Sequence, residues 1–272
     1  MYIDTHAHLY SSKFAADRPA MMDRIPAAGV DLTIMPAVDS RSHQGMIDLE
    51  REYPDRTLSM IGLHPCSVNA DVERELRAVE ELLDTRPWVA IGEIGMDLYW
   101  DKTFREQQEM AFRRQCGWAV ERGLPICIHA REAIDELLAI ITDIADERLH
   151  GVFHCFTGTV AQARRATELG FYLGIGGVAT FKNGGLEPVL REVDRNRIVL
   201  ETDAPYLAPV PKRGKRNETA FLPYVAEKIA EVWETSPLAV GRQTTANAWQ
   251  LFELDRFAKP EYAWAARRPV AG

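Results

Sequence analysis

The chain has little cysteine, and its four cysteines (Cys66, Cys116, Cys127 and Cys155) show no C-x-x-C pairing. Neither a disulfide framework nor a zinc ribbon is therefore expected. No segment approaches the roughly 20 consecutive apolar residues that cross a bilayer. The N-terminal MYIDTHAH has neither the basic start nor the apolar core of a secretion signal. We expect a soluble, monomeric, cytoplasmic protein with no membrane partner.

Positive charge is also in the minority, with 32 Lys and Arg against 40 Asp and Glu and a formal net charge of −8. A protein that binds nucleic acid over its whole surface is usually basic, so only a local basic patch is compatible with such binding here. The 46% hydrophobic and 26% charged residues are typical of a globular protein and exclude a fibrous or disordered chain. A length of 272 residues fits one (β/α)8 barrel, which typically needs about 250 residues.

Short apolar segments rich in β-branched residues alternate with longer amphipathic segments, a pattern that indicates parallel strands linked by helices. The expected strands are residues 2–6, 31–38, 57–63, 88–92, 125–129, 151–154, 171–175 and 197–202. Phe112, Cys116 and Ala119 share one face of a helical segment, and Val225 and Ile229 do so near the C-terminus. Eight strands predict an α/β fold with a single (β/α)8 barrel over residues 1–254, and an open doubly wound sheet is the alternative. The tail, residues 255–272, shows no periodic pattern of apolar residues, and its role is not predicted.

Polar side chains follow the apolar strand segments at the point where each segment ends. They are His6, His8, His64, Glu93, His129, His154 and Asp203. In a barrel these strand ends converge on one mouth. Burying such groups unpaired costs a few kcal/mol, so a whole ring of them indicates a functional site and not a core.

Each of these residues alone is weak evidence. His6 and His8 are two apart and project to the same side of a strand, but an isolated H-x-H is more often incidental. Glu93 or Asp203 alone would be interpreted as a helix cap. The candidate ligands together are His6, His8, Glu93, His129, His154 and Asp203. That set is too large for one catalytic zinc and suits two divalent ions (Mg, Mn or Zn) that share a bridging carboxylate and activate a water.

Other candidate residues have simpler interpretations. His43 and His150 are expected to be ordinary surface residues. Cys127 is expected to fill the barrel interior as a small apolar group, since no nearby base indicates a thiol nucleophile.

A basic segment at residues 211–217 (PKRGKRN) is expected to form a loop over the mouth after the last strand. A run of charges is as often a merely solvated loop. Arg216 and Asn217 are nevertheless candidates for binding a phosphate or a base. Loop aromatics that can stack on a base are Tyr99, Trp100, Phe181 and Tyr206.

Seven segments carry a family resemblance. They are DTHAH at 4–8, GLHP at 62–65, GEIGMD at 92–97, HAR at 129–131, HCFTG at 154–158, ETDAPYL at 201–207 and KRNE at 215–218. In this order they resemble the TatD family of metal-dependent deoxyribonucleases, within the amidohydrolase-like barrels, and the resemblance extends from Asp4 to about Phe252. Two positions depart from the family pattern: Cys66 stands where many relatives have a second histidine, and Thr219 replaces a frequent proline.

The resemblance implies a (β/α)8 barrel and an Mg-dependent nuclease that trims DNA or RNA from the 3′ end. It implies one ion among His6, His8, Glu93 and Asp203. It implies a second among Glu93, His129 and His154. Catalysis would rest on a water positioned by Glu93 and Asp203, with substrate contacts from His64, Arg216 and Asn217.

Two alternatives differ in class. A metal-dependent amidase or lactonase of the amidohydrolase group would share the barrel. Many such enzymes carry a modified lysine at the end of the fourth strand, where this chain has Glu93, and this favours the nuclease. A non-catalytic scaffold has no use for an intact set of ligands.

Overall fold

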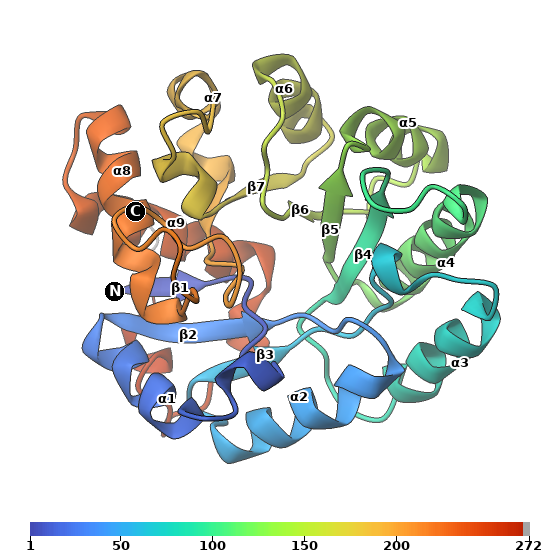
Figure 1. Ribbon diagram of the computed structural model, residues 1–272, viewed down its shortest axis with the longest axis horizontal. Helices are drawn as coiled ribbons and strands as arrows, with labels where there is room; N and C mark the ends of the chain where they lie inside the picture. The colour runs from blue at the N-terminus through green and yellow to red at the C-terminus, as the bar shows by residue number, and fades with distance from the viewer. Residues whose placement is uncertain (269–272) are drawn as a thin grey trace.

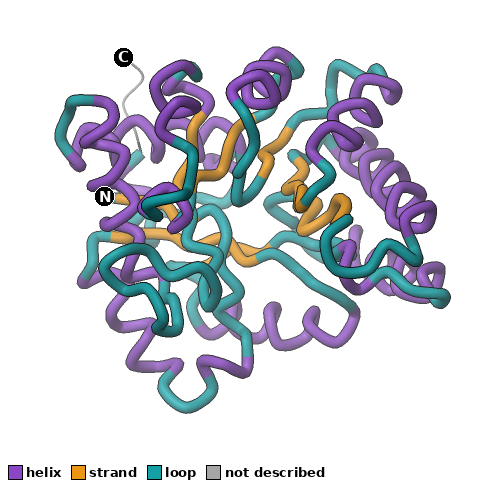
Figure 2. The backbone as a smooth tube through the Cα atoms, turned by 45° about the horizontal axis from the view of Figure 1, so that its top comes forward, coloured by secondary structure: helices purple, strands orange, loops and turns teal. Residues whose placement is uncertain are grey.

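The computed structural model describes residues 1–268, in which the strands form an inner wall surrounded by helices (Figures 1 and 2). Within that range the strands are β1 (Tyr2–Asp4), β2 (Val30–Met35), β3 (Thr57–Ser59), β4 (Ile91–Asp97), β5 (Ile126–Arg131), β6 (Gly151–Phe153), β7 (Tyr172–Ile175) and β8 (Ile198–Leu200). Each expected strand segment overlaps one of them, and the paired strands are parallel.

The strands close into a barrel. They form two sheets, ordered β1-β2-β3 and β4-β5-β6-β7-β8. Parallel bridges between Ile61 and Ile91 and between Ala7 and Ala204 join the edges of these sheets. The predicted (β/α)8 barrel is therefore confirmed. The open doubly wound sheet is wrong, because an open sheet would leave its two outer strands unpaired.

Helices cover the outside of the barrel (Figure 1). Those in residues 1–268 are α1 (Arg18–Ala27), α2 (Ser40–Glu52), α3 (Val72–Leu83), α4 (Arg105–Arg122), α5 (Ile134–Ile144), α6 (Val160–Glu168), α7 (Glu187–Glu192), α8 (Leu222–Trp233) and α9 (Pro237–Leu251). The predicted apolar faces are confirmed, since Phe112 and Cys116 of α4 and Val225 and Ile229 of α8 are buried. None of the described helices is both long and apolar enough to span a membrane.

β4 differs from its predicted range of 88–92. It begins at Ile91 and continues to Asp97, and its register with β5 shifts between Gly92 and Ile94. Glu93 is thus the extra residue of a bulge. The predicted end at Gly92 is wrong because the apolar run stops there while the backbone pairing goes on. A bulge re-aims a side chain, and here it turns Glu93 toward the strand ends.

Part of the C-terminal tail packs onto the barrel. Trp264 is only 2% exposed, and its ring lies 5.5 Å from that of Trp249 in α9. It shares an apolar cluster with Ile3 and Leu32, which lie near the beginnings of β1 and β2. Residues 255–268 therefore cover the end of the barrel opposite the predicted mouth. The last four residues of the predicted tail, 269–272, lie outside the described residues.

His43 corrects one prediction. It was expected at the surface, but it is 4% exposed within α2. It lies three and four residues before Met46 and Ile47, which are also buried, so all three share the face that packs on the barrel. Burial lowers the pKa of this histidine. His150 is half-buried beside β6.

Candidate metal centre

The carboxylate of Glu93 lies among the strand ends and is 2% exposed. Its Oε2 atom faces His6 and His8, at 3.2 and 3.7 Å from their Nε2 atoms. Asp203 completes this side, with Oδ1 3.8 Å from Nε2 of His6 and 3.5 Å from Nε2 of His8. Two imidazoles and two carboxylates thus converge, a donor set that suits a divalent ion.

The other oxygen of Glu93 faces a second group of histidines. Oε1 lies 2.8 Å from Nδ1 of His129, 3.2 Å from Nε2 of His154 and 3.1 Å from Nε2 of His64. One carboxylate therefore presents one oxygen to each of two clusters, which is the arrangement of a bridging ligand.

These side chains come from separate strands. His6 and His8 follow β1, His64 follows β3, Glu93 lies in β4, His129 in β5, His154 follows β6 and Asp203 follows β8. The sequence-predicted ligands are all brought together. Asp203 has a φ of 56°, a left-handed conformation that Asp tolerates better than most residues. The turn after β8 thus carries local strain to place this carboxylate.

The cluster nearest β1 is chemically incomplete without a cation. Nε2 of His6 is buried and has no hydrogen-bond partner among residues 1–268, although it points at the carboxylates of Glu93 and Asp203. A neutral imidazole that presents its lone pair there faces negative oxygens, which is unfavourable unless a proton or a metal ion lies between them. The residues present therefore fit a divalent ion.

The charges of the centre favour the same conclusion. Burial alone would raise the pKa of Glu93, but His64, His154 and His6 outweigh burial and hold that pKa well below its usual range. Burial also opposes the shift at His154, whose pKa is raised well above its usual value because Glu201 and Glu93 lie beside it. Without metal the carboxylates thus hold a second proton on His154, and a metal ion at its Nε2 would displace that proton.

A carboxylate behind His154 fixes its orientation. Oε1 of Glu201 lies 3.1 Å from Nδ1 of His154 and accepts the backbone N–H of Cys155 at 2.6 Å. Glu201 is fully buried. A Cβ atom at Gly174 would lie 2.2 Å from Oε2 of Glu201, so only glycine leaves room for this carboxylate. His154 donates through Nδ1 and keeps the lone pair of Nε2 for an ion.

Asp97 orients His129 in the same way but through the other nitrogen. Oδ2 of Asp97 accepts from Nε2 of His129 at 2.9 Å, which leaves Nδ1 of His129 facing Glu93. Oδ1 of Asp97 accepts the backbone N–H groups of Tyr99 and Trp100 at 3.0 and 3.1 Å. One carboxylate thus connects this histidine to the loop after β4.

The two histidines after β1 are held less strongly. Nδ1 of His8 lies 3.2 Å from the hydroxyl of Tyr10, which donates to the carbonyl of Pro36 at 2.7 Å. Nδ1 of His6 lies 3.3 Å from Sγ of Cys127. Cys127 was expected only to fill the barrel interior, and it does so fully buried, but it also contacts this histidine. Both Nε2 atoms remain directed at the carboxylates.

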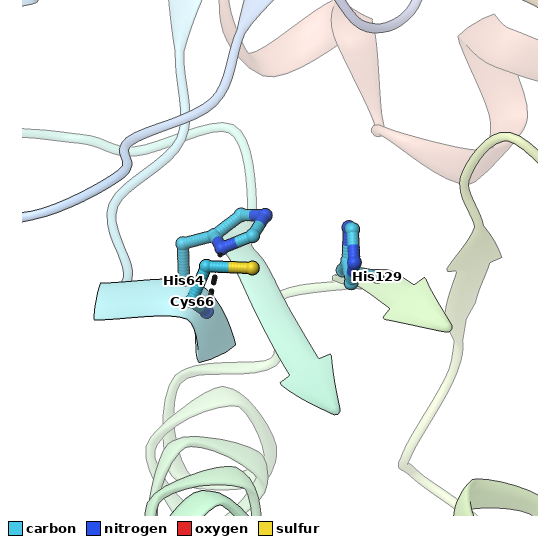
Figure 3. Close-up of side chains that lie close together, drawn as sticks. All are labelled: His64, Cys66 and His129. Carbon is cyan, nitrogen blue, oxygen red and sulfur yellow. Dashed lines mark hydrogen bonds between the residues drawn. The ribbon is translucent and has the colours of Figure 1, made fainter. Parts of the chain in front are cut away.

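His64 is held at its Nδ1 by a donor and not by an acceptor. Its Nδ1 accepts the backbone N–H of Cys66 at 3.0 Å, as Figure 3 shows. An accepting Nδ1 carries no proton, so the proton of the neutral ring is on Nε2. Burial lowers the pKa of His64, which favours the neutral form. His64 therefore presents an N–H donor to the centre, where the other histidines would present lone pairs to an ion.

Cys66 lies at the edge of this group. Its sulfur is on the side of His64 that faces His129 (Figure 3), and it lies 3.4 Å from Oδ2 of Asp97. Burial and the neighbouring Asp97 raise the pKa of Cys66 to about 12. The side chain is therefore a thiol and not a thiolate, in agreement with the expectation that no cysteine acts as a nucleophile.

A pocket of about 420 Å³ opens beside the centre. His129, His154 and Asp203 line it, together with Tyr99 and Arg131. The predicted ligands are thus reachable from solvent through a cavity that accommodates a small ligand or one residue of a polymer.

The two predicted contacts in the basic loop are engaged elsewhere. Arg216 pairs with Asp17, with N–O distances of 2.6 and 2.8 Å. Asn217 is fully buried, and its amide nitrogen donates to the carbonyls of Thr202 and Tyr206. These contacts indicate that both residues hold the loop after β8. A role in substrate binding stays a prediction.

Sequence reasoning missed Asp97, Glu201 and Arg131. Asp97 and Glu201 lie an even number of residues from Glu93 and Asp203, so the strand-end rule that found the ligands also covers them. Arg131 lies two residues after His129 in β5. The side chains that these three residues contact lie on other strands or loops, so the contacts cannot be predicted from the local sequence.

Comparison with known proteins identifies the relatives of this chain. The family model described as TatD related DNase matches residues 3–253. The chain is 37% identical over 256 residues to YabD of Bacillus subtilis, described as an uncharacterized metal-dependent hydrolase, and the match covers 94% of this chain and 100% of that protein.

Two further relatives extend this result. The 3′-5′ ssDNA/RNA exonuclease TatD of Salmonella typhimurium is 34% identical over 259 residues, which covers 92% of this chain and 98% of the relative. The crystal structure of YJJV, a TatD homologue from Escherichia coli K12, superposes with a TM-score of 0.86 at 29% identity, covering 93% of this chain and 98% of that one.

Proposed function

Because the chain belongs to the TatD-related DNase family of metal-dependent hydrolases, we propose that it hydrolyses phosphodiester bonds at the 3′ ends of single-stranded DNA or RNA. The observation that carries this proposal is the position of Glu93, whose two oxygens face two separate groups of histidines. The family name and the exonuclease name of the Salmonella relative support the choice of substrate.

We assign two divalent ions to the centre. His6, His8 and Asp203 would hold one, His129 and His154 would hold the other, and Glu93 would bridge them. When bound, such ions supply positive charge to the phosphoryl oxygens and activate a water nucleophile. Mn²⁺ and Zn²⁺ suit mixed imidazole and carboxylate ligands, and Mg²⁺ suits them where carboxylates and waters dominate.

The protein's own residues would accept a proton, donate a hydrogen bond to the substrate and orient the metal ligands. Asp203 lines the pocket and is ionised, since His8 and the neighbouring histidines hold its pKa below the usual range despite burial, so it can accept the proton of an attacking water. Nε2–H of His64 points at Oε1 of Glu93, 3.1 Å away, and can donate to a phosphoryl oxygen bound beside that carboxylate. Asp97 and Glu201 keep the imidazoles of His129 and His154 in the tautomers that bind an ion.

The proposal is tested by metal removal and reconstitution. Metal-free protein is given Mg²⁺, Mn²⁺ or Zn²⁺ singly and assayed on single-stranded DNA and RNA labelled at either end, beside a panel of lactones and amides. We expect metal-dependent release of mononucleotides from the 3′ end, and its loss in Glu93→Ala with the fold intact by circular dichroism. Turnover of a lactone or amide without cleavage of nucleic acid would instead support the amidohydrolase alternative.

A further inference from the structure

Two exposed aromatic side chains lie beside the pocket, on the loop after β4. Tyr99 is 48% exposed and lines the pocket, and Trp100, next to it, is 69% exposed. Their rings are perpendicular, with centroids 4.9 Å apart. Large aromatic groups exposed beside a polar cavity are a recurrent means of binding bases, because every nucleobase has a π-face.

An arginine lies over both rings. The guanidinium carbon of Arg131 is 4.0 Å from the ring centroid of Tyr99 and 5.1 Å from that of Trp100. Within residues 1–268, Arg131 makes no salt bridge, whereas Arg216 is paired with Asp17. Among the residues that line the pocket, Arg131 is thus the Lys or Arg side chain whose charge no carboxylate neutralises.

The position of this group relative to the metal centre is fixed by Asp97. Its Oδ1 holds the backbone of Tyr99 and Trp100, and its Oδ2 holds the ring of His129. Asp97 itself is 2% exposed. A ligand on the aromatic rings is thereby held at a set position relative to an ion bound by His129.

We propose that Tyr99, Trp100 and Arg131 form a platform that binds one unpaired nucleotide next to the scissile phosphate. Since Arg131 covers one face of Tyr99, the base stacks on the more exposed ring of Trp100, and Arg131 contacts the backbone phosphate. The proposal rests on the proposed function and gives it a reason for single-strand preference: in a duplex the base faces are already covered by neighbouring bases, so the platform cannot engage them.

Binding is measured separately from hydrolysis. A short fluorescent single-stranded DNA with phosphorothioate linkages, which resist cleavage, is titrated onto the Mg-loaded wild type, Trp100→Ala and Tyr99→Ala. The titration is repeated with an abasic sugar at each of the last two 3′ positions in turn. Loss of one base–aromatic contact weakens binding roughly 5- to 150-fold. We expect that loss in Trp100→Ala, and a similar loss for wild type with one of the two abasic strands.

Titrating the abasic strand onto Trp100→Ala tests whether the missing base and the missing indole contact each other. If the base stacks on the platform, the abasic strand and Trp100→Ala together lose no more than either alone. Arg131→Gln should also lower the log–log salt slope by about 0.7, the value for one phosphate contact to a single strand. Leu238→Ala, which removes an exposed apolar side chain from α9, is the control and should bind like wild type.

Three results would each overturn the platform. The losses of affinity caused by Trp100→Ala and by the abasic strand could be strictly additive at both positions. Trp100→Ala could bind as tightly as wild type, or the wild type could fail to bind. Cleavage of the unmodified strand is followed in parallel. If the wild type binds with the expected coupling but leaves that strand intact, the nuclease proposal fails while the platform stands.

Discussion

Each imidazole of the centre is held at one nitrogen, and this determines what its other nitrogen can do. His129 and His154 donate to Asp97 and Glu201 and direct their other nitrogen at Glu93, where its lone pair is available to a metal ion once the proton is displaced. His64 accepts a backbone N–H and directs a proton there instead. Three histidines at similar distances from one carboxylate oxygen are therefore not equivalent.

This difference predicts separate effects of removing each ring. His129→Ala and His154→Ala should lower the metal content from about two ions per chain to about one, because both rings serve the second ion. His64→Ala should keep both ions and lose turnover, since its N–H acts on the substrate. Elemental analysis of the three dialysed proteins measures this, and equal metal loss in all three would show that His64 is a ligand.

Asp97 is predicted to act through His129. Asp97→Asn keeps the shape of the side chain but makes its hydrogen bond to His129 weaker and neutral. Loss of such a partner typically reduces metal affinity 10- to 100-fold. Titration with Mn²⁺ followed by electron paramagnetic resonance should show one weakened site and one unchanged site. Two unchanged affinities would mean that Asp97 only holds the loop after β4.

At the scale of elements, the loop after β8 carries the remaining basic side chains. Replacing Lys212, Arg213 and Lys215 with glutamine should weaken the salt dependence of binding to single-stranded DNA. The slope of the logarithm of the binding constant against the logarithm of the salt concentration should fall by about 0.7 per lost phosphate contact. Hydrolysis of a small chromogenic phosphodiester should hardly change, because that substrate does not reach the loop. Arg216 is left in place because its ion pair with Asp17 holds the loop. An unchanged slope would mean that these charges are only solvated.

The sequence predicts some features of the strands and loops and not others. Strand positions and strand-end ligands follow from apolar runs that stop at a histidine or carboxylate, and this local pattern is readable. The pairing of Arg216 with Asp17 joins positions 199 residues apart, so the charge of the basic loop is overestimated from sequence. The bulge at Glu93 is also invisible, because the strand continues after its apolar run has ended.

For the whole molecule, the stability of the fold depends on packing at the closed end of the barrel, opposite the mouth. Trp264 fills a cluster with the beginnings of the strands and with α9. Trp264→Ala should reduce the free energy of unfolding by roughly 3 kcal/mol through the cavity it leaves. Trp100→Ala, which removes an exposed indole, is the matched control and should change stability little. Urea denaturation of both variants measures this, and equal midpoints would mean that the tail does not support the barrel.

The central claim is that Glu93 bridges two metal ions. The most direct test is diffraction from crystals of the Mn²⁺-loaded protein near the manganese absorption edge, since anomalous scattering locates each ion. We predict two peaks about 3.5–4 Å apart, one beside His6, His8 and Asp203 and the other beside His129 and His154, with Glu93 contacting both. A single peak, or a second peak that does not contact Glu93, would contradict the account.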